Sequence, residues 1–259
     1  MLAEVIRLYD SELRGDPPPI AGVRYERAEG VIRARGRGNW IYARDLDCAD
    51  ANAVVAREAQ LFTNLGENVE WKVYGYEQCR DCLPDRLAAH GFTPADVETL
   101  MICDLSQWRS SSPAPPGIRI TRVSDMQGLL DLAQVMSEAF HDVEPGMLEE
   151  LKASCLATDP IVFAYVAYAG EAPVASARME SPVGYSFGSL WGGCTLPAFR
   201  HRGIFRALVS IRVDDARRRG HSYLAVDAAD TSKPILERLG FCPIATVRGW
   251  NLDRASAAR

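Results

Sequence analysis

The order of hydrophobic and polar positions predicts a chain in which helices and strands alternate. Apolar residues recur at helical spacing over residues 2–14, 51–65, 83–90, 125–140, 204–219 and 232–239. Alternating or continuous apolar runs predict strands at 40–43, 69–74, 99–105, 118–123, 161–168, 172–180, 190–196, 223–227 and 246–252, with looser alternation over 23–35. This order predicts an α/β fold in which a mixed sheet carries helices on both faces.

The two halves of the chain end alike. Five residues recur at a constant offset of 149 positions, each time in the order helix, Gly-Phe, strand. The pairs are Leu87 and Leu236, Gly91 and Gly240, Phe92 and Phe241, Pro94 and Pro243, and Asp104 and Asp253. Residues 110–117, rich in serine and proline, form a linker by composition. The sequence therefore predicts two tandem domains, 1–109 and 118–259.

The most distinctive stretch joins the strand at 190–196 to the helix that begins near residue 204. Arg200, Arg202 and Arg206 surround Gly203 where the loop opens this helix. The first N–H groups of a helix have no intrahelical partner, and with the helix dipole they form a site for phosphate. Glycine lets a ligand approach the backbone closely. The loop therefore indicates an anion site, and the alternative is an ordinary solvated basic helix start.

This loop resembles that of GNAT-family N-acetyltransferases, whose pattern Arg/Gln-x-x-Gly-x-Gly/Ala grips the pyrophosphate of acetyl-coenzyme A. The run Arg200-His201-Arg202-Gly203-Ile204-Phe205 fits at its first and fourth positions, and it departs at the sixth, where Phe205 replaces a small residue. The flanks Thr195-Leu196-Pro197 and Arg206-Ala207-Leu208 also look like the family. The resemblance implies two tandem GNAT-like domains.

The resemblance also implies where acetyl-coenzyme A binds. It places the cofactor in the second half, on Cys194, Thr195, Leu196, Arg200, His201, Arg202, Gly203, Ile204, Phe205, Arg206 and Ser232. In the family, a backbone N–H of the strand before the loop polarises the thioester, which here implies residues 194–196. The letters at 33–38 mimic the motif, but a strand follows them. The first half is therefore expected to be a degenerate copy without cofactor.

An amine attacks a thioester only when it is unprotonated, so a general base helps the reaction. The candidates are Glu138, His141, Asp142 and Glu144, in and after the first helix of the second half, with Glu180 and Asp227 as further options. Many family members carry a tyrosine as general acid where this chain has Leu236. Tyr223 is expected to be a packed strand residue, and Cys194 a small buried residue rather than a nucleophile.

Composition narrows the class of protein. The chain has 259 residues, 47% of them hydrophobic and 24% charged, and a net charge of −5, which argues against a nucleic-acid partner. No apolar run approaches the ~20 residues that span a bilayer, and the N-terminus lacks a signal-peptide core. Seven cysteines without regular spacing favour a reducing cytoplasm. Cys79 and Cys82 form a lone CxxC, which we expect to be reduced thiols rather than a metal site.

Together these observations predict a cytoplasmic N-acetyltransferase that moves an acetyl group from acetyl-coenzyme A to a primary amine by direct attack. The acceptor is a small molecule or a peptide, with no metal, nucleic acid or membrane involved, and the oligomeric state stays open. The alternative is a non-catalytic acyl-coenzyme A sensor. The leucine at position 236 and Phe205 favour this alternative. A third hypothesis is a transferase with a longer acyl or aminoacyl donor.

Overall fold

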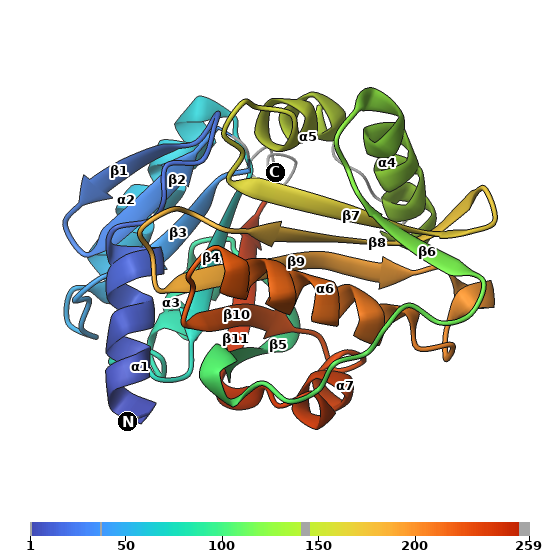
Figure 1. Ribbon diagram of the computed structural model, residues 1–259. Helices are drawn as coiled ribbons and strands as arrows, with labels where there is room; N and C mark the ends of the chain where they lie inside the picture. The colour runs from blue at the N-terminus through green and yellow to red at the C-terminus, as the bar shows by residue number, and fades with distance from the viewer. Residues whose placement is uncertain (1, 37, 141–145, 254–259) are drawn as a thin grey trace. The chain divides into compact units, whose positions relative to one another are not determined.

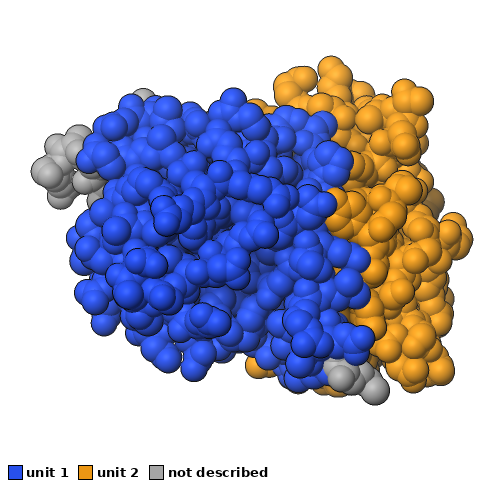
Figure 2. Space-filling model, turned by 90° about the vertical axis from the view of Figure 1, so that its left-hand side faces the viewer, with its two compact units in different colours: residues 1–100, 227–230, 243–259 blue, residues 101–226, 231–242 orange. Residues whose placement is uncertain are grey.

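A computed structural model describes residues 2–36, 38–140 and 146–253 (Figure 1). The chain divides into two compact units, which Figure 2 colours blue and orange. Unit 1 holds residues 1–100, 227–230 and 243–259, and unit 2 holds residues 101–226 and 231–242. The units thus differ from the predicted domains, because the last strand joins unit 1 through its pairing. The predicted boundaries follow the sequence repeat and stay a prediction.

Unit 1 contains a largely antiparallel sheet with helices packed against it. Its elements are α1 (Leu2–Tyr9), the π-helix η1 (Asp10–Gly15), β1 (Arg24–Ala28), β2 (Val31–Arg35), β3 (Trp40–Ala43), α2 (Ala51–Leu65), β4 (Val69–Tyr74), α3 (Leu83–Ala89) and β11 (Cys242–Leu252). The strand order is β1-β2-β3-β4-β11, with only β3 and β4 parallel. β5 (Thr93–Asp104) starts in unit 1 and ends in unit 2, followed by the short helix η2 (Leu105–Gln107).

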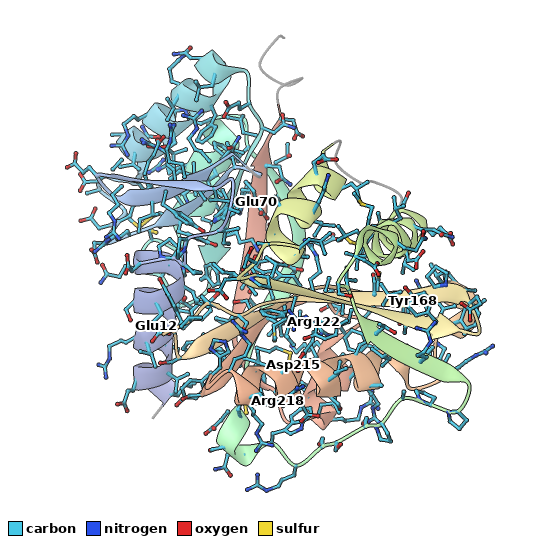
Figure 3. The ribbon with its side chains drawn as sticks, turned by 45° about the horizontal axis from the view of Figure 1, so that its top comes forward. Glu12, Glu70, Arg122, Tyr168, Asp215 and Arg218 are labelled. Carbon is cyan, nitrogen blue, oxygen red and sulfur yellow. A yellow bond between two sulfur atoms is a disulfide. The ribbon has the colours of Figure 1, made fainter. Side chains whose placement is uncertain are left out.

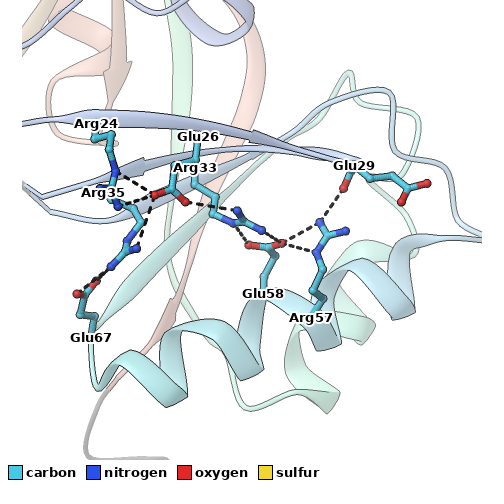
Figure 4. A network of polar contacts seen from close by, with 8 residues as sticks. All are labelled: Arg24, Glu26, Glu29, Arg33, Arg35, Arg57, Glu58 and Glu67. Atoms are coloured by element: carbon cyan, nitrogen blue, oxygen red, sulfur yellow. Dashed lines mark hydrogen bonds and ion pairs between the residues drawn. The ribbon is translucent and has the colours of Figure 1, made fainter.

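Helix α2 packs on this sheet through both apolar and charged contacts. Its apolar stripe, including Val55 and Phe62, lies in a core with Trp71 of β4. The carboxylate of Glu58 is fully buried and pairs with Arg33 of β2, in a network of arginines and glutamates drawn in Figure 4. A buried charge is tolerated only when it is paired, so this network fixes α2 in one register on the sheet.

Unit 2 contains a second set of strands. Its elements are β6 (Ile118–Arg122), α4 (Met126–Phe140), α5 (Met147–Cys155), β7 (Val162–Ala169), β8 (Ala172–Glu180), β9 (Phe187–Thr195), the 3₁₀-helix η3 (Pro197–Phe199), α6 (Ile204–Arg218), β10 (Tyr223–Ala228), whose last two residues belong to unit 1, and α7 (Lys233–Arg238). The strand order is β10-β9-β8-β7-β6, with only β9 and β10 parallel. Apart from α5 and η3, each of these helices and each strand follows the pattern predicted from the sequence.

Helices cover opposite faces of β7, because successive side chains of a strand point to opposite sides. Ala164 and Val166 pack in a core with α4 and α5. On the other face, the hydroxyl of Tyr165 donates a hydrogen bond to Asp215 of α6. The mixed sheet with helices on both faces, predicted as the fold class, is confirmed.

The sequence repeat has a structural counterpart within each unit. The Phe92 N–H donates to the carbonyl of Leu87 at 3.0 Å, and the Phe241 N–H donates to that of Leu236, also at 3.0 Å. The intervening Gly91 and Gly240 have φ of +88° and +98°, which favours glycine. The matched leucine, glycine and phenylalanine therefore specify the same glycine-containing end of a helix twice.

The segment 110–117 lies along α6 rather than spanning open space (Figure 1). The Ser112 N–H donates to Ser210 Oγ at 3.0 Å, and this hydroxyl donates to the Ser110 carbonyl at 3.5 Å. Composition predicted a linker here, and these contacts hold it against the helix that carries the candidate loop.

The prediction of reduced thiols in the CxxC pair is wrong for Cys82. Cys82 forms a disulfide with Cys48, which lies 34 positions earlier in the chain, just before α2. Cys79 is a free and buried thiol, and burial raises its pKa to about 11. The spacing of the pair did not reveal this bond, because the bond joins two segments that only the fold brings together.

Candidate functional site

The loop from β9 to α6 forms an open helix N-terminus in unit 2. Gly203 caps α6 with φ of +84°, and the first intrahelical bond runs from the Ala207 N–H to the Gly203 carbonyl at 3.1 Å. Among the residues that the structure describes, the N–H groups of Ile204, Phe205 and Arg206 have no acceptor. These groups are donors pointed at one place, which suits a phosphate group.

Positive charge surrounds these donors. Arg200, Arg202 and Arg206 are exposed, as is His201, which has φ of +62°. The Arg200 Nε donates to the Thr195 carbonyl at 3.0 Å, so this side chain is tied to the end of β9. The Arg202 guanidinium lies 5.0 Å from the centre of a phenylalanine ring in η3. The sequence motif therefore becomes a cationic rim around free N–H groups.

Phe205, the departure from the family pattern, is accommodated by a glycine on the neighbouring strand. A Cβ added at Gly193 of β9 would lie 3.1 Å from the Phe205 ring. The ring thus occupies the space that a side chain at position 193 would fill. This arrangement explains how a large residue stands at the sixth position while the N–H groups stay open.

The edge of β9 is unpaired where it approaches this loop. β9 and β10 pair in parallel only as far as Ser189 and Ala225, whereas the pairing of β9 with β8 continues to Thr195. The β8–β9 ladder shifts register between Ser176 and Arg178, where Gly192 adopts φ of +53°. Such a bulge bends the strand and leaves backbone groups open to an extended ligand.

Of the three predicted strand residues, Leu196 and Thr195 direct their N–H groups to opposite sides of β9. The Leu196 N–H donates to the Val174 carbonyl of β8 at 2.9 Å, so it is already engaged. Since N–H groups alternate in direction along a strand, the Thr195 N–H faces the open edge. The Oγ1 of Thr195 is buried and has no hydrogen-bond partner among the described residues.

Cys194 behaves as the expected buried residue. Its side chain is only 8% exposed, and a 3.2 Å hydrogen bond joins its Sγ to the Ser176 hydroxyl. Burial raises the pKa of this thiol above its ordinary value, which disfavours the nucleophilic thiolate.

The candidate bases do not form a cluster among the described residues. Glu138 is exposed on α4, where it accepts a hydrogen bond from Gln134 at 3.0 Å. His141, Asp142 and Glu144 lie outside the described residues. Glu180 ends β8 and is partly buried.

Asp227 is not a free base. Within unit 1, its carboxylate pairs with the Lys72 ammonium at 2.9 Å, and both side chains are largely buried. Burial by itself lowers the pKa of Lys72, and the carboxylates of Asp227 and Glu70 together raise it above its ordinary value. Asp227 therefore neutralises a buried cation.

The remaining predicted residues lie at the other elements of unit 2. Ser232 precedes α7, and its side chain makes no helix-capping hydrogen bond. Leu236, at the family's tyrosine position, is 2% exposed. Tyr223 stacks on Phe187 at 5.0 Å between ring centres, as expected for a packed strand residue.

Helix α6 is anchored at the end opposite the loop. Asp215 accepts a hydrogen bond from Tyr165 of β7 and pairs with Arg218 in the last turn (Figure 3). Midway along α6, the buried Arg212 donates to the carbonyls of Leu208 at 2.8 Å and Arg178 at 3.1 Å. The N-terminus of α6 is thus presented on a fixed support.

Two kinds of feature are absent from the residues that the structure describes. No group of three or more His, Cys, Asp or Glu residues within 2–36, 38–140 and 146–253 is arranged to bind a metal ion. In the same ranges, no helix combines the length and the apolarity that crossing a bilayer requires.

Comparisons with known proteins agree with this geometry. Residues 129–241 match the model of the acetyltransferase (GNAT) family. A search of curated proteins finds no match. The fold is similar to a GCN5-related N-acetyltransferase from Kribbella flavida, with 16% identity, 89% of each chain covered and a TM-score of 0.69. It is also similar to one from Sphaerobacter thermophilus, with 13% identity, 97% of this chain and 85% of the other covered and a TM-score of 0.63.

A third similar structure is a tandem GNAT protein from the clavulanic acid biosynthesis pathway, with 11% identity, 91% of this chain and 85% of the other covered and a TM-score of 0.61. Residues 129–241 therefore match the acetyltransferase (GNAT) family model, and the fold is similar to that of GCN5-related N-acetyltransferases. The family uses acetyl-coenzyme A, and the fold supports acyl transfer.

Proposed function

We propose that the chain is an N-acetyltransferase that transfers the acetyl group of acetyl-coenzyme A to a primary amine. The observation that carries this proposal is the set of free N–H groups at Ile204–Arg206, rimmed by Arg200 and Arg202. A pyrophosphate is a double anion with several acceptor oxygens, and it matches both the donors and the charge. No other described part of unit 2 combines these two properties beside an open strand edge.

The strand β9 supplies the second part of the mechanism. The bound cofactor supplies a thioester carbonyl that a neutral amine attacks directly, with the thiolate as leaving group. The Thr195 N–H, which faces the open edge, donates to the developing oxyanion. The buried Thr195 hydroxyl, which has no hydrogen-bond partner among the described residues, is suited to donate a hydrogen bond to the thiolate.

Proton removal from the amine falls to a carboxylate or imidazole on the acceptor side, for which we retain Glu138, His141 and Asp142. Because the described residues bring no second candidate base beside Glu138, positioning and polarisation of the carbonyl provide most of the rate enhancement. We therefore expect turnover to rise with pH as the acceptor amine loses its proton.

We propose that only the second half binds the cofactor. In the first half, two N–H groups of the loop before α2 are engaged within the loop, because the Asp47 carboxylate accepts from Ala49 at 2.8 Å and from Asp50 at 3.1 Å. The Arg14 guanidinium donates to the carbonyl at the end of β3 at 3.4 Å and so occupies part of the space beyond the β3–β4 pairing.

The rival function is a non-catalytic acyl-coenzyme A sensor. The buried leucine at position 236 favours it, because no tyrosine stands there to protonate the thiolate. The test is release of free thiol from acetyl-coenzyme A in the presence of a panel of primary amines. Amine-dependent release supports the transferase, and release equal to the background for every amine, despite cofactor binding, refutes it in favour of the sensor. Repeating the assay with longer acyl donors tests acyl preference.

A further inference from the structure

A cavity of about 410 Å³ lies within unit 1. Its walls come from α1 and η1, from residues 43–46 after β3, and from residues 76–79 after β4. β3 and β4 are parallel, and their pairing stops at Tyr42 and Lys72. The cavity therefore lies beyond the carboxyl ends of a parallel strand pair, where α/β folds commonly bind ligands, and its volume is in the range of small-molecule sites.

The inner end of the cavity carries an excess of negative charge. The buried Arg14 donates to Asp10 Oδ1 at 2.7 Å and pairs with Glu77, so one cation faces two carboxylates. The Tyr76 hydroxyl also donates to Asp10 Oδ1 at 2.7 Å. Among the described residues, Asp10 Oδ2 accepts no hydrogen bond, and the Asp10 side chain is 37% exposed. This oxygen is available to a donor from a ligand.

The rim carries an excess of positive charge. Arg7 is exposed and makes no hydrogen bond or ion pair with any residue that the structure describes. Arg44 approaches Asp45 only at 3.7 Å, and the Asp45 side chain is 94% exposed to water. Two guanidinium groups thus face the opening with one loosely associated carboxylate.

We propose that this cavity binds a free α-amino acid. The ammonium group lies at the inner end against Asp10, and the carboxylate lies at the rim between Arg7 and Arg44. The whole lining is electrically balanced, so a ligand with a net charge would leave a charge unpaired in a partly desolvated site, whereas a zwitterion matches both ends. The side chain of the amino acid lies against an apolar wall formed by Ile32 and Leu46.

The proposal is tested by calorimetric titration of the full chain with the common L-amino acids. For the tightest ligand, the titration is repeated with the analogue that lacks the ammonium and with the analogue that lacks the carboxylate. We expect a Kd below about 1 mM for at least one amino acid. Both analogues should bind at least about tenfold more weakly, because each loses one charge-assisted contact.

Two variants locate the binding site. Arg7→Gln should weaken binding about tenfold through loss of the carboxylate contact. It should leave the fold intact, because Arg7 is exposed and makes no contact that the fold needs. The matched control is Arg86→Gln, which removes an exposed arginine of α3 outside the cavity lining and should leave the affinity unchanged.

A third protein separates this site from the cofactor loop of the proposed transferase. Gly203→Asp disrupts the cofactor loop and should bind the amino acid as the wild type does. The proposal is overturned if no amino acid binds with a Kd below about 1 mM. It is equally overturned if an analogue with one charge binds as tightly as the zwitterion, or if Arg7→Gln binds as tightly as the wild type.

Discussion

Replacing Gly203 by aspartate tests whether the start of α6 holds a pyrophosphate. A Cβ at this position would meet only Pro115, at 3.6 Å, so the loop has room for a side chain. The residue has φ of +84°, which costs a side chain on the order of 1–2 kcal/mol. Asparagine and aspartate have the same shape and share this cost. The Gly203→Asn protein is therefore the control, and the difference between the two proteins reports the carboxylate charge.

The expected size of this difference follows from Coulomb's law. At roughly 5 Å in a solvent-exposed site, with an effective dielectric constant of about 60, two unit charges repel by about 1 kcal/mol. A pyrophosphate with two negative charges is then repelled by about 2 kcal/mol, which is a loss of affinity of about thirtyfold.

The assay is calorimetric titration of the wild type, Gly203→Asn and Gly203→Asp with acetyl-coenzyme A. We expect the aspartate protein to bind about thirtyfold more weakly than the asparagine protein, with a gap that narrows as salt screens the repulsion. Equal affinities of the asparagine and aspartate proteins would show that no anion is bound at the N-terminus of α6, and the site assignment would have to be abandoned.

Three further predictions concern the packing around both halves. Gly193→Ala should lower the free energy of unfolding by about 1–3 kcal/mol in denaturant titration, because the new methyl group overlaps a packed ring, and an unchanged midpoint would contradict that packing. Cys82→Ser removes the disulfide to Cys48 and should lower the free energy of unfolding by about 3–4 kcal/mol, and adding reductant to the wild type should lower it by the same amount. A wild-type denaturation midpoint that does not change with reductant would contradict the disulfide. Lys72→Met should lower the free energy of unfolding by about 3–5 kcal/mol because it leaves Asp227 unpaired, and adding Asp227→Leu should restore most of that free energy. A double variant as unstable as the single one would argue against a buried ion pair.

Much of the fold could be predicted from the sequence because its signals are local. Helix α6 shows apolar positions at helical spacing, three arginines at its end and Gly220 beyond, and the structure ends it there with φ of +86° at this glycine. Helix α2 likewise ends at Gly66, which adopts φ of +64°. At its start, the Asp47 carboxylate accepts from the N–H groups of Ala49 and Asp50, whereas the Asp50 side chain makes no capping hydrogen bond.

Features that depend on distant segments could not be predicted in this way. β11 joins unit 1 because Trp250 pairs opposite Trp71, a contact that no local pattern reveals. The bond between Cys48 and Cys82 depends on the fold for the same reason. Helix α5, in contrast, had a usable signal, since Leu151 and Cys155 of its buried face are spaced by one helical turn.

The candidate site shows the same division. The loop around Gly203 could be predicted because a contiguous motif carries it, whereas the open edge of β9 depends on where its pairing with β10 stops. The space for Phe205 depends on Gly193, which lies on another element. Asp227 looked like a free carboxylate, and only the fold shows that Lys72 neutralises it.

The central claim is that one of the two halves binds acetyl-coenzyme A. The most direct test is calorimetric titration of the intact chain with acetyl-coenzyme A and, separately, with free coenzyme A. The account predicts saturable binding of both ligands with close to one molecule per chain. Absence of binding would contradict the cofactor site in the second half. Binding of two molecules per chain would contradict the proposal that only the second half binds the cofactor.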